Sequence, residues 1–267
     1  MQLAIRHTTH YRFDRPVVHG LQQLRLKPRS QPGQAVIDWH MTLEGARVEV
    51  EYEDQNRNRT TLASAIPGAE EVTITCEGLV ETADCSGIVG PHSGFMPLWL
   101  YGNQTALTAP GPKMRSLAAD LRAEVPDRLD LLHRLSGAVL DAIRYEVGHT
   151  TASTPAEQAL ASGHGVCQDH AHVFIGCARL LGFPARYASG YLMMNDRIDQ
   201  EAGHGWAEAH VEGLGWIGFD VSNGICPDQR YVRVATGRDY RDAAPVTGIS
   251  YGAGESVLKV SLAVEQQ

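Results

Sequence analysis

The sequence predicts an α+β fold in which an N-terminal β-sandwich is followed by a core where a cysteine-bearing helix packs on an antiparallel sheet. Short strand-like runs separated by turn residues fill roughly the first 88 residues. Helical repeats begin near residue 113, and one of them starts at a cysteine. Three strand-like runs after that helix, at residues 185–193, 204–211 and 216–221, are expected to complete the antiparallel sheet.

These signals divide the chain into three parts. Residues 1–88 are predicted to form the sandwich, and residues 113–267 to form the core. Residues 89–112, rich in glycine and proline, are expected to cross between them as a packed segment. Strands are expected at residues 3–13, 22–26, 36–43, 48–52, 72–79, 185–193, 204–211, 216–221 and 256–264.

Three helices are predicted ahead of the cysteine. Two are indicated by apolar stripes, one through Met114, Leu117 and Leu121 and one through Leu132, Leu135, Val139 and Ile143. The third is expected to have Thr154 as its N-cap, Pro155 in its first turn and Glu157 as the capping glutamate. It should end before Gly163.

Cys167 is predicted to stand at the start of a helix. Apolar residues recur after it at helical spacing, and the repeat ends at Gly182. A thiol at a helix start faces unpaired backbone N–H groups and the positive end of the helix dipole, which favours the thiolate. We therefore expect Cys167 to be a nucleophile. Cys177, on the apolar side of the same helix, is expected to belong to the core.

His204 and Asp220 are expected to lie on one β-hairpin. Residues 204–211 and 216–221 are strand-like, and a glycine-rich turn separates them. A turn of three residues places His204 diagonally across from Asp220 on the same face of the sheet. A turn of two or four residues needs a bulge to correct the register. We expect one arrangement or the other.

Cysteine, histidine and aspartate follow one another in the order of a thiol acyl-transfer triad. His204 would take the proton of the Cys167 thiol and later protonate the leaving amine. Asp220 would accept the other ring N–H of His204 and fix its orientation. A second reading of Asp220, as a turn-capping residue before Ser222, stays open. The Cys167 N–H is expected to meet the developing oxyanion, together with a second donor that the sequence does not identify.

The histidines raise a metal hydrolase as an alternative. His164, His170 and His172 crowd the cysteine, and His204 and His210 follow. On a helix, His170 and His172 point about 200° apart, so they cannot chelate one ion as an i, i+4 pair would. The spacing therefore argues against a metal site.

The motifs around the cysteine, histidine and aspartate follow a known family pattern. Three motifs resemble those of the bacterial transglutaminase-like superfamily. Gly165-Val-Cys167 is similar to its Gly-x-Cys motif, His204-Gly-Trp-Ala-Glu208 to its His-Ala-Trp-x-Glu motif, and Asp220-Val-Ser-Asn223 to its Asp-Pro-Thr motif. Gly205 replaces the usual alanine, and His210 stands where an aromatic is common. With residues 182–191, the resemblance spans roughly residues 105–245.

The start of the chain is similar to the N-terminal β domain of the same family. His7-Thr-Thr-His-Tyr11, residues 24–29 and residues 54–58 carry this similarity, although Arg57 sits where a glycine is usual. The resemblance implies a papain-like, transglutaminase-like core behind this domain. It also implies that no cofactor is needed, because nothing is similar to the calcium-binding loops of animal transglutaminases.

Composition restricts the partners and the compartment. A formal charge of −8 and a pI near 5.8 argue against a nucleic-acid partner. No secretion-type leader opens the chain and no long apolar run occurs in it, so we expect a cytoplasmic protein with no membrane partner. The five scattered cysteines do not suggest a disulfide framework.

The expected reaction begins with transfer of an acyl group from an amide of a peptide or protein substrate to the thiol of Cys167. Water as acceptor makes the enzyme a peptidase or amidase, whereas an amine makes it a transglutaminase. The resemblance implies proteases, deamidases or cross-linkers alike. A cross-linking enzyme must shield its thioester from water, commonly with tryptophans. Of the four tryptophans, only Trp99 is free for such a role, so we expect hydrolysis. A non-catalytic peptide-binding module is the alternative from another class.

Overall fold

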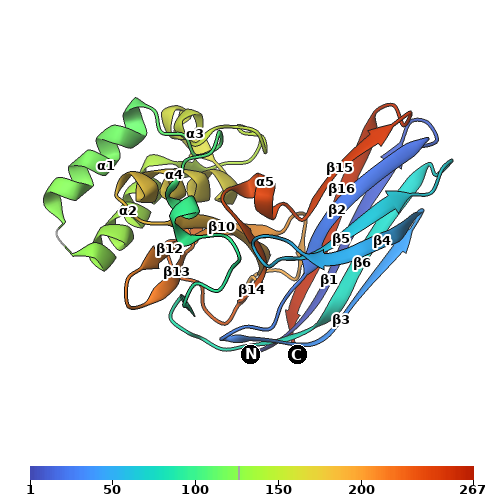
Figure 1. Ribbon diagram of the computed structural model, residues 1–267, viewed down its shortest axis with the longest axis horizontal. Helices are drawn as coiled ribbons and strands as arrows, with labels where there is room; N and C mark the ends of the chain where they lie inside the picture. Colours follow the sequence, from blue (N-terminus) through green and yellow to red (C-terminus); the bar gives the residue numbers. More distant parts are fainter. Residues whose placement is uncertain (126) are drawn as a thin grey trace.

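The structure is a computed structural model and describes residues 1–125 and 127–267. Its helices gather at one end of the molecule and its long strands at the other, and a mixed region joins them (Figure 1). Both chain termini lie close together at the lower edge of this view. The predicted α+β fold is confirmed.

The long strands form two antiparallel sheets that pack face to face as the predicted sandwich. The first sheet has the order β11 (Asp199–Gln200), β16 (Ser256–Gln266), β1 (Gln2–Phe13), β6 (Glu71–Thr82) and β3 (Gln34–Glu44). The second has the order β15 (Val246–Tyr251), β2 (His19–Lys27), β5 (Arg59–Ala65) and β4 (Ala46–Glu53). Alternate residues of their inner faces, including Leu24, Ala63 and Ile74, form a buried apolar cluster.

Strands from both ends of the chain build this sandwich. β16 pairs with β1 over its whole length, and β15 pairs with β2. The predicted core, residues 113–267, is therefore too long, because β15 and β16 belong to the sandwich. Alternation of side chains identifies a strand but does not identify the strand with which it pairs. β5 and β15 were not predicted at all.

The core is built around α4 (Cys167–Leu180), which packs on a third sheet. That sheet has the order β14 (Tyr231–Gly237), β10 (Ala185–Leu192), β12 (His204–Val211), β13 (Gly215–Phe219) and β7 (Ile88–Gly90). The other sides of α4 contact α1 (Pro112–Glu124), α2 (Arg128–Ala142) and α3 (Ala156–Ser162). Every residue from Asp169 to Arg179 is buried, as is typical of a helix enclosed on all sides.

Short elements complete the core. They are η1 (Leu98–Gly102), β8 (Arg144–Tyr145), β9 (His164–Gly165), η2 (Val221–Asn223) and α5 (Tyr240–Ala243). Within the described parts of the chain, no helix is both long and apolar enough to cross a membrane.

The start of α3 differs from the sequence prediction. Pro155, and not Thr154, stands at the cap position. The Thr154 hydroxyl instead accepts the N–H of Thr151. The Glu157 carboxylate reaches across to α1, where it accepts the backbone N–H groups of residues 111, 113 and 114 at 2.8–3.1 Å. Glu157 therefore caps a neighbouring helix and not its own, because tertiary packing brings the start of α1 within its reach.

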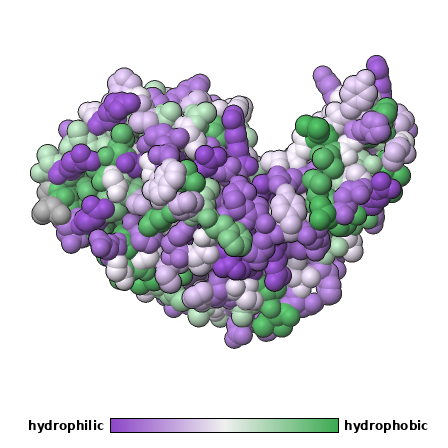
Figure 2. Space-filling model, viewed as in Figure 1, coloured by the Kyte–Doolittle hydropathy of each residue, from purple (hydrophilic) through white to green (hydrophobic). Residues whose placement is uncertain are grey.

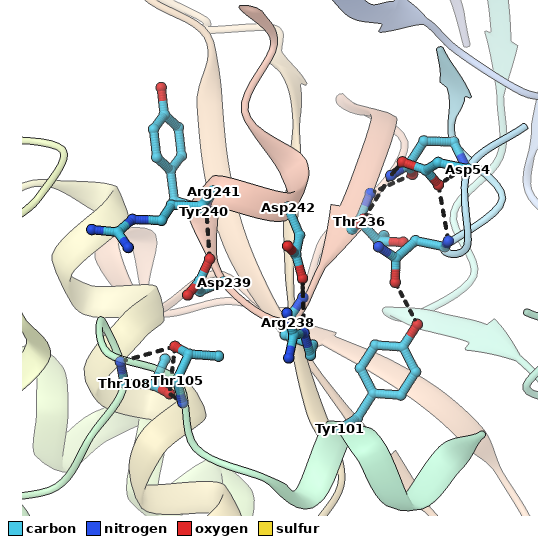
Figure 3. A network of polar contacts seen from close by, with 12 residues as sticks. Asp54, Tyr101, Thr105, Thr108, Thr236, Arg238, Asp239, Tyr240, Arg241 and Asp242 are labelled. Carbon is cyan, nitrogen blue, oxygen red and sulfur yellow. Dashed lines mark hydrogen bonds and ion pairs between the residues drawn. The ribbon is translucent and has the colours of Figure 1, made fainter. Parts of the chain in front are cut away.

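Side chains of the sandwich cover the free edge of the core sheet at β14. The Gln34 amide bonds both the N–H and the C=O of Arg233, and the Asn58 amide does the same with Thr236. These bonds replace a missing neighbour strand and fix the sandwich loops on the core. Figure 3 shows Tyr101 of the crossing segment pointing toward the loop that carries Asp54. With Tyr101 buried and β7 paired to β13, this segment is packed.

Candidate active site

The first turn of α4 presents Cys167. The carboxylate of Asp169 accepts the N–H of Val166 at 2.8 Å and the hydroxyl of Thr150 at 2.7 Å, and both bonds fix the chain ahead of the cysteine. The Cys167 side chain is partly exposed. As the first residue of the helix, Cys167 has a backbone N–H with no acceptor inside the helix. The predicted helix start at this cysteine is confirmed.

The hairpin of β12 and β13 has the register that a three-residue turn was predicted to produce. Val211 pairs with Gly215, which leaves residues 212–214 as the turn, and the pairing continues without a bulge to Ala207 and Phe219. Extending this register places Asp220 opposite residue 206, two positions from His204 and on the same face. The two side chains therefore meet diagonally.

His204 and Asp220 are in direct contact. The Nε2 atom of His204 lies 2.6 Å from Oδ2 of Asp220, and both side chains are almost fully buried. Burial by itself disfavours the imidazolium. Hydrogen bonds to Asp220 and Cys167, and the negative charges of both, outweigh burial and raise the pKa of His204 to about 10. Since Nε2 bonds Asp220, Nδ1 is the ring atom left for the thiol.

The Asp220 carboxylate also caps the turn that follows it. Its Oδ1 accepts the Ser222 hydroxyl at 2.8 Å, and its Oδ2 accepts the Asn223 amide at 2.7 Å and the Tyr231 hydroxyl at 2.6 Å. Burial raises the pKa of this carboxyl, but these bonds and the charge of His204 lower it to about 2. One carboxylate thus contacts His204 and caps the turn at Ser222 and Asn223.

Three tyrosines surround the thiol. Burial raises the pKa of Tyr145, Tyr187 and Tyr240, and the next cause for each is the negative charge of Cys167. Tyr187 contacts Tyr240 edge-on at 5.9 Å between ring centroids. Tyr187 is buried and Tyr240 partly buried, whereas Tyr145 is exposed.

Glu208 and Trp206 support the hairpin from the face that carries His204. Glu208 is fully buried and bonds Arg186 at 2.6 Å and Arg233 at 3.0 Å. The two guanidinium groups keep the pKa of Glu208 low despite its burial. Trp206 is buried and stacks on His204 at 6.2 Å between ring centroids.

The remaining histidines near the cysteine have separate partners. His170 bonds the backbone C=O groups of Val166 and Ile143, and His172 accepts the N–H of Tyr240. Burial lowers the pKa of His172 to about 3, so this ring is neutral. In the part of the chain that the structure describes, no group of three or more histidine, cysteine or acidic side chains is arranged to hold a metal ion.

Cys177 is fully buried in the core cluster beneath α4, as predicted, and burial raises its thiol pKa to about 12. Sequence reasoning missed Tyr231, Tyr187 and Tyr240. Tyr231 opens β14, a strand that was not predicted although residues 231–236 alternate in the way that a strand does. The alternation could have revealed the strand. The contact with Asp220 depends on tertiary structure and could not have been read from the sequence.

Comparisons with known proteins agree with this arrangement. Residues 115–221 match the Transglutaminase-like superfamily, and residues 3–81 match the Bacterial transglutaminase-like N-terminal region. The chain therefore belongs to the transglutaminase-like superfamily, with the bacterial N-terminal region ahead of its core. Membership supports a thiol-enzyme family in general terms.

Relatives cover nearly the whole chain. An uncharacterized protein of Mycobacterium tuberculosis (strain ATCC 25618 / H37Rv) is 29% identical over 97% of this chain and 91% of its own length. An uncharacterized protein of Mycobacterium leprae (strain TN) is also 29% identical, over 97% of this chain and 96% of its own. The crystal structure of "a Putative Cysteine Protease from Cytophaga hutchinsonii" has a TM-score of 0.79 and 20% identity, and covers 100% of this chain and 91% of that one. It shares the fold.

Proposed function

We propose that this chain is a thiol-dependent amide hydrolase that cleaves a peptide or isopeptide bond through Cys167, His204 and Asp220. The observation that carries the proposal is the contact of His204 Nε2 with Asp220, because it leaves Nδ1 for the thiol at the start of α4. A histidine held between a carboxylate and a thiol is the arrangement that thiol proteases use.

The proposed reaction proceeds in two halves. His204 takes the thiol proton, and the thiolate attacks the carbonyl carbon of the amide, forming a C–S bond and an oxyanion that the Cys167 N–H meets. The C–N bond breaks, the imidazolium protonates the leaving amine, and a thioester remains. Water then attacks the thioester, gives its proton to His204, and the thiolate leaves as the acid product forms.

Water is the proposed acceptor because tryptophans do not form a shield around the site. Trp206 and Trp216 are buried in packing within the core, and Trp39 lies in β3 of the sandwich. Trp99 alone is largely exposed. An amine competing with water at roughly 55 M needs an apolar channel, which these positions do not supply.

The test is to trap the acyl-enzyme. Incubation with a peptide library at mildly acidic pH and rapid denaturation should leave a mass increment on Cys167, which peptide mapping would locate and identify. Cys167→Ala should carry none. A hydrolase releases the acid even when a labelled primary amine is present at millimolar concentration. Dominant incorporation of the amine into the product would make the protein a transglutaminase. Release of ammonia from a glutamine side chain would make it a deamidase. Peptide binding without any acylation of Cys167 would indicate a non-catalytic peptide-binding module.

A further inference from the structure

A cavity of about 360 Å³ lies where the sandwich meets the core, away from Cys167. Its wall combines sandwich residues 29–32 and 56–58 with Val89, Pro91, Ser93 and Gly94 of the segment that follows the sandwich. The core contributes Arg186 of β10, Trp216 of β13 and residues 233–236 of β14. Hydrophilic residues gather on the visible face of the molecule where the two lobes join (Figure 2). A volume of this size is in the range of small-molecule sites, which lie preferentially between domains.

The wall of this interdomain cavity is cationic. It includes four guanidinium groups, those of Arg29, Arg57, Arg186 and Arg233, and no aspartate or glutamate is among its described lining residues. Two carboxylates form ion pairs with these arginines. Glu208 pairs with Arg186 and Arg233, and Glu53 pairs with Arg29 and Arg57. Four positive charges against two negative ones leave a local excess of two in a chain whose net charge is −8.

The excess is concentrated on the sandwich side of the cavity. Glu208 bonds both core arginines at 2.6–3.0 Å and is fully buried, so their charge is closely matched. Glu53 is half-exposed and lies farther from its two arginines, at 3.7 Å from Arg29 and 3.3 Å from Arg57. Arg29 and Arg57 therefore keep more of their positive field than Arg186 and Arg233 do.

Arg57 holds its place at a conformational cost. Its φ is +63°, in the left-handed region that favours glycine. A non-glycine residue is strained in this conformation. The guanidinium that this residue provides bonds Glu53 and the C=O of Ser93 beside the cavity. Retaining an arginine where glycine fits without strain points to a use for its charge.

Asn56 adds a buried donor without a partner. Its side chain is 7% exposed and lines the cavity. Its Oδ1 accepts the hydroxyl of Tyr101 at 2.7 Å, while its Nδ2 has no partner among the described residues. A buried N–H donor that stays unpaired is unfavourable, so an acceptor is expected for it.

We propose that the interdomain cavity binds a small molecule through a phosphate or carboxylate group, at a site separate from the triad. The oxyanion would bridge Arg29 and Arg57 of the sandwich to Arg233 of the core, with Asn56 as a neutral donor. Charge-assisted bonds from planar guanidinium groups suit both phosphate and carboxylate. Because the ligand would contact both domains, binding should stabilise the folded chain as a whole.

Binding is tested on the full chain by isothermal calorimetry and thermal denaturation, with inorganic phosphate and citrate in separate titrations at constant ionic strength. We expect saturable binding of at least one of them and a rise in melting temperature that chloride does not reproduce. Phosphate alone would identify a phosphate site, and citrate alone a carboxylate site. Failure of both anions to bind saturably overturns the proposal.

Variants locate the binding. Arg29→Gln and Arg57→Gly should each weaken the affinity by about tenfold or more, and Arg57→Gly should fold well because it relieves the positive φ. Arg6→Gln is the matched control, since Arg6 is an exposed arginine of β1 outside the cavity wall. Wild-type affinity in Arg29→Gln and Arg57→Gly, or an equal loss in Arg6→Gln, would show that the anion binds elsewhere. Cys167→Ala should bind as the wild type does, which separates this site from the proposed hydrolase.

Discussion

The hydroxyl group of Tyr187 occupies the space that a side chain on residue 205 would need. A methyl group built on Gly205 would stand 1.9 Å from the Tyr187 oxygen and 2.6 Å from its Cζ atom. An alanine at this position therefore cannot be accommodated while Tyr187 keeps its position. The glycine and the tyrosine form a matched pair beside Cys167.

Gly205→Ala should lower the free energy of unfolding by about 1–3 kcal/mol because it overpacks this contact. In a Tyr187→Leu background the same substitution should cost less, since the ring tip is gone. Chemical denaturation of the wild type, the two single variants and the double variant measures the coupling energy between the two positions, which we expect to reach about 1 kcal/mol. Gly137→Ala is the control: no atom lies within 4 Å of its added Cβ, and it should be neutral or stabilising in α2. If the effects of Gly205→Ala and Tyr187→Leu on the free energy of unfolding are additive, the steric conflict between residue 205 and Tyr187 is ruled out.

Cys167 should be the thiol that iodoacetamide labels fastest near pH 6, because it is partly exposed at the start of α4 beside the imidazole of His204. Burial raises the thiol pKa of Cys76 and Cys177 to about 12, and it raises the pKa of Cys226 as well. Timed alkylation followed by peptide mapping measures the order. Cys85→Ser should leave the rapid phase intact, and Cys167→Ser should remove it. Labelling of Cys85 at the rate of Cys167 would contradict the assignment.

Activity on a peptide amide should hold through pH 8 and fall as the pH approaches about 10. The imidazolium of His204 protonates the leaving amine, and its pKa is raised to about 10 by Asp220 and Cys167 against the effect of burial. In Asp220→Asn the alkaline limb should move to lower pH, and turnover should fall by roughly a hundredfold. His204→Ala should lose about a thousandfold or more. Profiles of kcat/KM against pH for the three proteins measure these effects. If the alkaline limbs of the wild type and Asp220→Asn coincide, Asp220 does not raise the pKa of His204 and the proposed contact between them is wrong.

Asp220 should also contribute to acid stability. Its pKa in the folded protein is depressed to about 2 from 3.8, so its contribution is fully present above about pH 4 and is lost as the pH falls toward 2. Over this window the wild type should lose on the order of 2 kcal/mol more than Asp220→Asn, whose side chain does not titrate. Urea unfolding of both proteins at pH 5, 4 and 3 measures the difference. Parallel losses in the two proteins would mean that other carboxylates dominate.

Glu157→Ala should destabilise the protein by about 2 kcal/mol, because the carboxylate accepts three backbone N–H groups at the start of α1. Glu157→Gln should cost less, since an amide oxygen still accepts. Glu212→Ala, in the exposed turn between β12 and β13, is the control and should be near neutral. Thermal denaturation compares the three, and equal melting temperatures for Glu157→Ala and Glu212→Ala would count against the cross-helix cap.

The parts of the site that follow from local pattern could be predicted from the sequence. The helix at Cys167 follows from apolar periodicity, and the diagonal meeting of His204 and Asp220 follows from strand alternation and turn length. Both are set within a few residues or by one hairpin.

Contacts between distant elements could not be predicted. Tyr231 reaches Asp220 from β14, a strand that the pattern left unassigned, and Tyr187 meets Gly205 across two strands. Glu157 caps α1 from a separate helix. Each contact depends on how elements dock in space, and propensity and periodicity do not encode docking.

The pairing of β16 with β1 has a consequence for the order in which the chain can fold. Residues 3–13 form their hydrogen bonds on one side with residues 256–266, so about 250 intervening residues must be synthesised before that edge of the sheet can close. Until then β1 presents an open edge of unpaired N–H and C=O groups, the kind of surface on which nascent chains aggregate. The core around α4 is not held back in this way, since its helices and hairpin form from nearby residues. A ribosome-bound chain should therefore complete its thiol site before its amino-terminal sheet, and a fragment that ends at residue 88 should associate with itself.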